Sequence, residues 1–139
     1  MIVLDTNVVS ELIRPSPAAA VQRWVDVNPG DEIHVTAITL AEVRYGIQRL
    51  PDGRRNGLLR VAAEEILATF EDRILVFDDV AATWYASTVV TREAAGRPIQ
   101  PFDALIAAIC GAHRAALATR NTKDFEGLGL DLVDPWDTP

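Results

Sequence analysis

The length, composition and charge of the chain exclude several classes of protein. Its 139 residues suffice for one domain with a hydrophobic core, and 49% apolar with 24% charged residues is typical of a folded globular protein. A formal net charge of -7 argues against wrapping nucleic acid in a global positive field, so any such contact must be local. No membrane span or secretory signal is visible, and a cytoplasmic location without membrane contact is therefore expected.

The first part of the chain predicts alternating strands and helices, because apolar residues recur first at strand spacing and then at helix spacing. The expected elements are a strand at 1–4, helices at 8–13 and 17–25, a strand at 33–35, and helices at 38–50 and 59–70. Thr36 or Thr39 can cap the helix at 38–50.

The second part continues the alternation. The expected elements are a strand at 74–77, a helix through 84–89, an almost wholly apolar helix at 103–113, a strand at 116–119, a brief turn or helix from 124, and a strand at 130–133. Asp78 or Asp79 can cap the helix through 84–89. Residues 1–133 are expected to form one domain, followed by a loosely held C-terminal tail at 134–139.

This order predicts an α/β fold with a mainly parallel sheet of about four to five strands flanked by helices. In such folds, ligands bind at the carboxyl ends of the strands, where neighbouring connections diverge to opposite faces. Asp5 closes the first strand, while Asn121 and Asp124 follow the strand that ends at Thr119. These residues are therefore candidates for a common site.

Two further acids lie on helices among apolar neighbours. Glu42 shares its face with Ile38 and Tyr45, and Asp103 precedes a run of apolar residues. An ionised carboxylate on a core-facing stripe is costly unless a cation or hydrogen-bond donors compensate it. Asp5, Asp103 and Asp124 could each be a helix cap if taken singly, but together with Glu42 they favour a shared site.

The residue types of this site favour a hard cation. The lone Cys110 lies in an apolar helical pattern, and His34 and His113 occupy unrelated positions, so structural zinc is disfavoured. Oxygen ligands suit Mg²⁺ or Mn²⁺, which bind phosphates and lower the pKa of bound water from ~15.7 toward neutrality. The sequence thus indicates metal-assisted attack of water on a phosphodiester, without a protein nucleophile.

Four segments of the chain resemble PIN domains, specifically VapC toxins and their FitB-like relatives. These segments are LDTNVVSEL, AITLAEVRYGI, PFDALIAAI and ATRNTKDF, and the resemblance spans essentially the whole chain. It implies a single PIN-like domain in which Asp5, Glu42 and Asp103 are the principal metal-binding acids, and Thr6 and Asn7 support Asp5 and contribute to substrate binding.

The resemblance also bears on the segment after the strand at 116–119. It implies that Thr119 steadies the water or phosphate and that Arg120 contacts phosphate, although a surface arginine is an equal alternative. Many relatives carry a fourth acid where this chain has Asn121, with Asp124 three residues later. Either Asn121 is a neutral ligand or Asp124 acts through water, and one or two metals remain possible.

VapC-like proteins are toxins that cleave RNA, form homodimers and are silenced by a small VapB-like antitoxin, sometimes in larger toxin-antitoxin assemblies. The resemblance therefore implies a Mg²⁺-dependent endoribonuclease, with Mn²⁺ as a substitute, whose partners are RNA, a VapB-like antitoxin and a second copy. Two alternatives remain: an aspartyl phosphatase of the haloacid-dehalogenase type, in which Asp5 attacks phosphate, and a non-catalytic PIN-like interaction module. Against the phosphatase, Asn7 stands where that family has a second acid.

Overall fold

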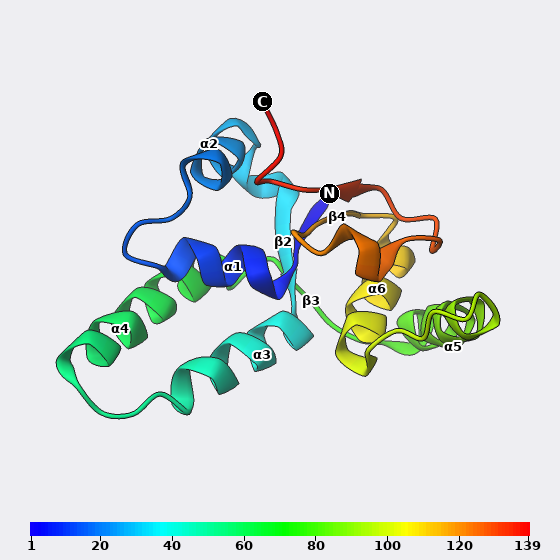
Figure 1. Ribbon diagram of the computed structural model, residues 1–139, viewed down its shortest axis with the longest axis horizontal. Coiled ribbons are helices and arrows are strands. Elements are labelled where there is room, and N and C mark those ends of the chain that lie inside the picture. Colours follow the sequence, from blue (N-terminus) through cyan, green and yellow to red (C-terminus); the bar gives the residue numbers. More distant parts are fainter.

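The computed structural model describes all 139 residues and has an α/β fold built on one five-stranded sheet (Figure 1). The strands are β1 (Ile2–Leu4), β2 (Ile33–Thr36), β3 (Ile74–Leu75), β4 (Ala116–Ala118) and β5 (Leu132–Val133). They lie in the order β3-β2-β1-β4-β5, and every neighbouring pair is parallel. The predicted fold class is confirmed.

Six helices and two short 3-10 helices connect the strands. They are α1 (Thr6–Ile13), α2 (Ala19–Val27), η1 (Gly30–Glu32), α3 (Ala37–Gln48), α4 (Arg54–Ala68), α5 (Asp79–Ala94), α6 (Pro101–His113) and η2 (Thr122–Phe125). Of the alternative caps, the structure selects Thr36, whose side chain accepts from the Thr39 amide, and Asp78, whose side chain accepts from the Ala81 amide. None of the helices has both the length and the apolar character needed to cross a membrane.

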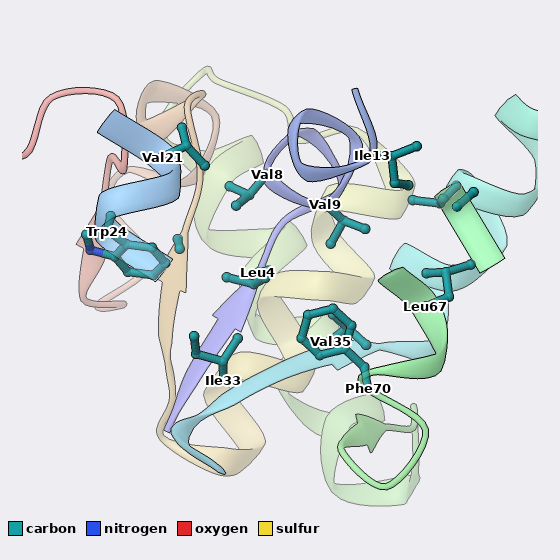
Figure 2. Close-up of a cluster of buried hydrophobic side chains, with 13 residues drawn as sticks. Leu4, Val8, Val9, Ile13, Val21, Trp24, Ile33, Val35, Leu67 and Phe70 are labelled. Carbon is teal, nitrogen blue, oxygen red and sulfur yellow. The ribbon is translucent and has the colours of Figure 1, made fainter. Parts of the chain in front are cut away.

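The two faces of the sheet bury separate hydrophobic clusters, because successive side chains of a strand point in opposite directions. On β1, Leu4 belongs to the larger cluster with residues of α1, α2, α3 and α4 (Figure 2). Val3 belongs to the smaller cluster, which α6 and β4 supply with Ile106 and Leu117. Helices therefore cover both faces, with α5 packed against α6 (Figure 1).

This arrangement creates a reversal of direction at β1. The connections that follow β1 and β2 carry α1 to α4 on one face, whereas α6 leads into β4 from the other face. Since β1 lies between β2 and β4, the connections diverge at its carboxyl end. Asp5 follows β1 at this point, as the sequence predicts.

Several expectations about local structure need correction. Asp103 does not cap α6, because Gln100 is the N-cap and Pro101 occupies the first turn. β3 ends at Leu75 instead of Phe77, since Val76 and Phe77 leave the sheet and are exposed. Within the predicted tail at 134–139, Trp136 packs against the larger hydrophobic cluster.

Candidate functional site

The central residue of the site, Asp5, is fixed by the strand and helix that it joins. Its amide donates to the Ala118 carbonyl at 2.9 Å, which continues the pairing of β1 with β4. The side chain is 5% exposed and accepts from the Thr6 amide at 2.8 Å, Asn7 Nδ2 at 3.1 Å and Thr119 Oγ1 at 2.7 Å. Asp5 is thus both the cap of α1 and a buried carboxylate held by three donors.

Glu42 reaches the same place from α3, which begins at the carboxyl end of β2. Its Oε1 accepts a hydrogen bond of 2.7 Å from Thr6 Oγ1, on the residue that follows Asp5. The sequence predicts that the face of α3 carrying Glu42 is turned toward the core. In the structure, however, Tyr45 on that face is 67% exposed. Glu42 is therefore compensated by a hydroxyl donor and by contact with solvent.

Asp103 lies in the first turn of α6, which begins beside the same edge of the sheet. Burial raises its pKa to about 6, and the carboxylates of Asp5, Asp124 and Glu42 add to the increase. Burial also raises the pKa of Asp5, although the hydrogen bond from Thr119 opposes this effect. The four acids therefore share one electrostatic environment in which a cation is favoured.

The three principal acids line one open hollow of about 560 Å³. Four other residues singled out from the sequence line it too, namely Thr6, Asn7, Arg120 and Asn121. Residues from α1, α3, α6 and the segments that follow β1 and β4 are thus brought together although they lie far apart in the chain.

Thr119 and Asp124 do not line the hollow but act on the residues that do. Thr119 is fully buried, and besides its bond to Asp5 its Oγ1 accepts from Asn7 Nδ2 at 3.2 Å and from the Asn121 amide at 3.0 Å. Burial is the main cause of the raised pKa of Asp5 and of Asp103, and the charge of Asp124 adds to both increases. The alternatives of Asn121 and Asp124 as fourth ligand both stay open.

Four residues that line the hollow are not predicted from the sequence. They are Ser10, Glu11, Arg14 and Trp136. Glu11 is buried and accepts from the Ala18 amide and from Arg14 Nη1, so it joins the end of α1 to the start of α2. Helical spacing from Asn7 would have placed Ser10, Glu11 and Arg14 on one face, whereas nothing local indicates Trp136.

Trp136 lines the hollow together with Arg120. The Arg120 guanidinium carbon lies 5.1 Å from the centroid of its ring, a distance typical of a cation-π contact. The Arg120 amide also donates to Asn7 Oδ1 at 3.2 Å. One arginine of the hollow is therefore held at both its main chain and its side chain.

The donor types of the hollow fit a hard divalent cation better than a soft one. Burial raises the pKa of the Cys110 thiol to about 12, and neither histidine lines the hollow, so sulfur and imidazole ligands are absent from it. As they stand, no three acidic, histidine or cysteine side chains lie close enough together to hold an ion between them. The fit rests on the carboxylate, amide and hydroxyl oxygens that face one space.

Comparison with known proteins identifies the family. Residues 2–129 match the PIN domain. The chain belongs to the PIN domain family. Among its relatives, VapC ribonuclease Y4jK of Sinorhizobium fredii is 40% identical over 138 residues, which are 99% of each chain. Toxin FitB of Neisseria gonorrhoeae is 37% identical over 137 residues, which are 98% of this chain and 99% of the toxin.

A solved structure supports the same family assignment for this PIN domain. The structure of FitAB bound to an IR36 DNA fragment matches with a TM-score of 0.92 and 36% identity, covering 100% of this chain and 98% of that one. The resemblance to PIN domains of the VapC and FitB type, and the fold expected from it, are confirmed.

Proposed function

We propose that this PIN domain is a metal-dependent endoribonuclease and the toxin of a type II toxin-antitoxin system. The observation that carries the proposal is the presence of Asp5, Glu42 and Asp103, from three separate elements, around one hollow. Uncompensated carboxylates repel phosphate, so this hollow needs a cation before it can accept RNA. The ribonuclease and toxin named among the relatives support this reading.

Asp5, Glu42 and Asp103 would hold the ion, which is Mg²⁺ or, in its place, Mn²⁺. An ion held there would supply Lewis acidity: it would lower the pKa of a water molecule and polarise a phosphoryl oxygen, so that the water oxygen could bond to phosphorus while a P–O bond of the RNA backbone breaks. No side chain of the protein has to become covalently attached to RNA. Asn121 or Asp124 completes the oxygen set.

The remaining residues orient these acids and the substrate. Thr119 and Asn7 donate to the same oxygen of Asp5 and leave its other oxygen with the Thr6 amide. Thr6 Oγ1 turns Glu42 toward the hollow. Arg120, held over Trp136, offers a planar donor to a phosphate of the bound RNA.

The acidic character of the hollow also indicates how a protein partner would bind it. An antitoxin of the VapB type would silence the site by presenting a basic side chain to the acids in place of the metal. The relatives support such pairing, since one is a toxin and FitAB has been solved as a complex on DNA. We further propose that the toxin acts as a homodimer in the cytoplasm and joins larger assemblies with its antitoxin.

The experiment is RNA cleavage by the purified chain, free of antitoxin, with Mg²⁺ or Mn²⁺ titrated in. Asp5→Asn should lower the cleavage rate at least ~100-fold, because one charged ligand is lost. It should stay folded, as a melting curve will check, because the amide keeps the shape of the side chain and one of the two oxygens that accept hydrogen bonds. Asp31→Asn, a matched change at an exposed acid outside the hollow, should cleave as the natural protein does.

Other results would favour the alternatives. Normal cleavage by Asp5→Asn would refute the assignment of this acid. Phosphate release from small monoesters without RNA cleavage would favour the aspartyl phosphatase, for which the family match offers no support. A protein that binds partners but never cleaves RNA, whatever the metal, would be a non-catalytic module.

A further inference from the structure

Beside the acidic hollow lies a second, largely apolar hollow of about 620 Å³. It is lined by Thr6, Ala41, Glu42, Tyr45 and Phe102. Thr6 and Glu42 line the acidic hollow as well, so the two spaces share an edge. We call the two aromatic side chains, Tyr45 and Phe102, the aromatic shelf.

Both rings of the aromatic shelf are exposed to solvent. Tyr45 is 67% exposed and Phe102 52%, although Val43 on the same helix and Ala104 on α6 are buried. The core is thus complete without these two rings, which carry large apolar surfaces into solvent. Paired exposed aromatics at the rim of a polar hollow are typical of a binding surface.

A third hollow also lies between the aromatic shelf and the acids. This smaller hollow connects the Phe102 ring with two of the principal acids, and it is lined by Glu42, Gln100, Pro101, Phe102 and Asp103. Phe102 immediately precedes Asp103 in the chain, and Tyr45 lies three positions after Glu42 on α3. A ligand bound at the acids is therefore within reach of both rings.

The charges around the aromatic shelf narrow the choice of ligand. No basic residue lines its hollow, and Glu42 forms one wall, so this surface repels a phosphate and accepts a neutral group. A cation beside the aromatic shelf is Arg49, whose guanidinium carbon lies 5.6 Å from the centroid of the Tyr45 ring. Proteins bind single-stranded nucleic acid by stacking its bases on aromatic rings, often with an arginine beside them.

We propose that the aromatic shelf is a nucleobase-binding subsite for the RNA substrate. The base of a nucleotide next to the scissile phosphate packs against both Tyr45 and Phe102, which line one hollow, and Arg49 meets an adjoining backbone phosphate. This inference rests on the proposed ribonuclease function and adds a site at which a base of the RNA substrate binds. Because every base has a stacking face, the subsite selects unpaired nucleotides more than a particular sequence.

The test is steady-state cleavage of a single-stranded RNA oligonucleotide that spans a site cut by the natural protein. Tyr45→Ala and Phe102→Ala should each raise KM about tenfold, within the range expected for loss of one stacked base, with kcat changed little. Tyr45→Phe, which keeps the ring, should restore the natural KM. Val90→Ala removes an equally exposed apolar side chain from α5 and should leave KM unchanged.

A change in the RNA provides a second, independent measurement. An abasic nucleotide beside the cut should raise the KM of the natural protein, and should have no further effect on the variant that lacks both rings. That loss of sensitivity separates stacking from a general structural defect.

Three results would overturn the proposal. Cleavage with unchanged KM in the variant lacking both rings would remove the subsite and leave the ribonuclease function intact. A fall in the mass of that variant from dimer to monomer would mean that a second copy of the chain covers the aromatic shelf. Absence of any RNA cleavage by the natural protein would overturn the proposed function and the subsite together.

Discussion

The Thr119 hydroxyl donates a hydrogen bond of 2.7 Å to Oδ2 of Asp5, across 114 positions in the chain. Both groups are buried, and each follows directly after a central strand of the sheet. The same hydroxyl accepts from the Asn121 amide. Thr119 therefore fixes the orientation of Asp5 and the path of the chain beyond β4 at once.

Replacing Thr119 tests whether this orientation governs metal binding. Thr119→Val keeps the shape of the side chain but removes the donor to Asp5, and should raise the Mg²⁺ concentration needed for half-maximal RNA cleavage by about 10- to 100-fold. Thr119→Ser keeps the hydroxyl and should need close to the natural concentration. Equal Mg²⁺ requirements for the valine and serine variants would show that the hydroxyl is not needed.

The raised pKa of Asp103 should make the stability of the metal-free protein depend on pH. Its pKa is raised from 3.8 to about 6 by burial and by the neighbouring acids, so between these values the folded state binds more protons than the unfolded state. The contribution of Asp103 to the free energy of unfolding is therefore greatest below about pH 4. It falls as the pH rises toward about 6 and stays low above that pH.

Asp103→Asn removes this dependence because the amide stays neutral. The variant should exceed the natural protein in free energy of unfolding by about 1–2 kcal/mol at pH 8, allowing for partial exposure, and should show no gain at pH 4. Urea unfolding with a chelator present at both pH values measures the difference. Equal stabilities at pH 8 would contradict the assigned burial of charge.

The sequence was sufficient to predict the elements that carry the principal acids. Asp5 ends a β-branched strand and Asp103 precedes an apolar helix, so local pattern alone indicates strand, turn and helix at these positions. The carboxyl ends of parallel strands share an edge, which explains why their convergence could be expected. Their roles as metal ligands stay predictions until cleavage and metal binding are measured.

Other features depend on long-range packing that no local pattern encodes. The buried Arg92 of α5 donates to the Asp124 carbonyl, so the path of η2 depends on a residue more than thirty positions earlier. Spacing within the segment from Asn121 to Asp124 could not reveal this contact. The packing of Trp136 against the core is likewise invisible in the local sequence, because it depends on the pairing of β5 with β4.

Trp136→Ala tests the contribution of this packed tail to substrate binding. Loss of the ring frees the Arg120 guanidinium, whose cation-π contact at an exposed site is worth about 0.5–1 kcal/mol. KM for RNA should therefore rise about two- to fivefold with little change in kcat. Trp136→Phe keeps an aromatic face and should recover most of the affinity, whereas equal defects in both variants would exclude a role for the ring.

Gly111 in α6 is the glycine at which an added Cβ would meet neighbouring atoms. A Cβ there would lie 2.5 Å from Cε3 of Trp84 on α5, which is too close for any carbon contact. Gly111→Ala should therefore lower the free energy of unfolding by about 1–3 kcal/mol. Gly57→Ala in α4 meets no atom within 4 Å and should instead raise it by about 0.5–1 kcal/mol.

A second substitution shows whether the clash itself causes the loss at Gly111. Trp84→Leu makes room for the new methyl group, so the double variant should be more stable than the sum of the two single changes predicts. Urea unfolding of the four proteins gives the coupling. Additive losses would mean that α5 and α6 move apart freely, and the position of Asp103, in the first turn of α6, would then owe nothing to this contact.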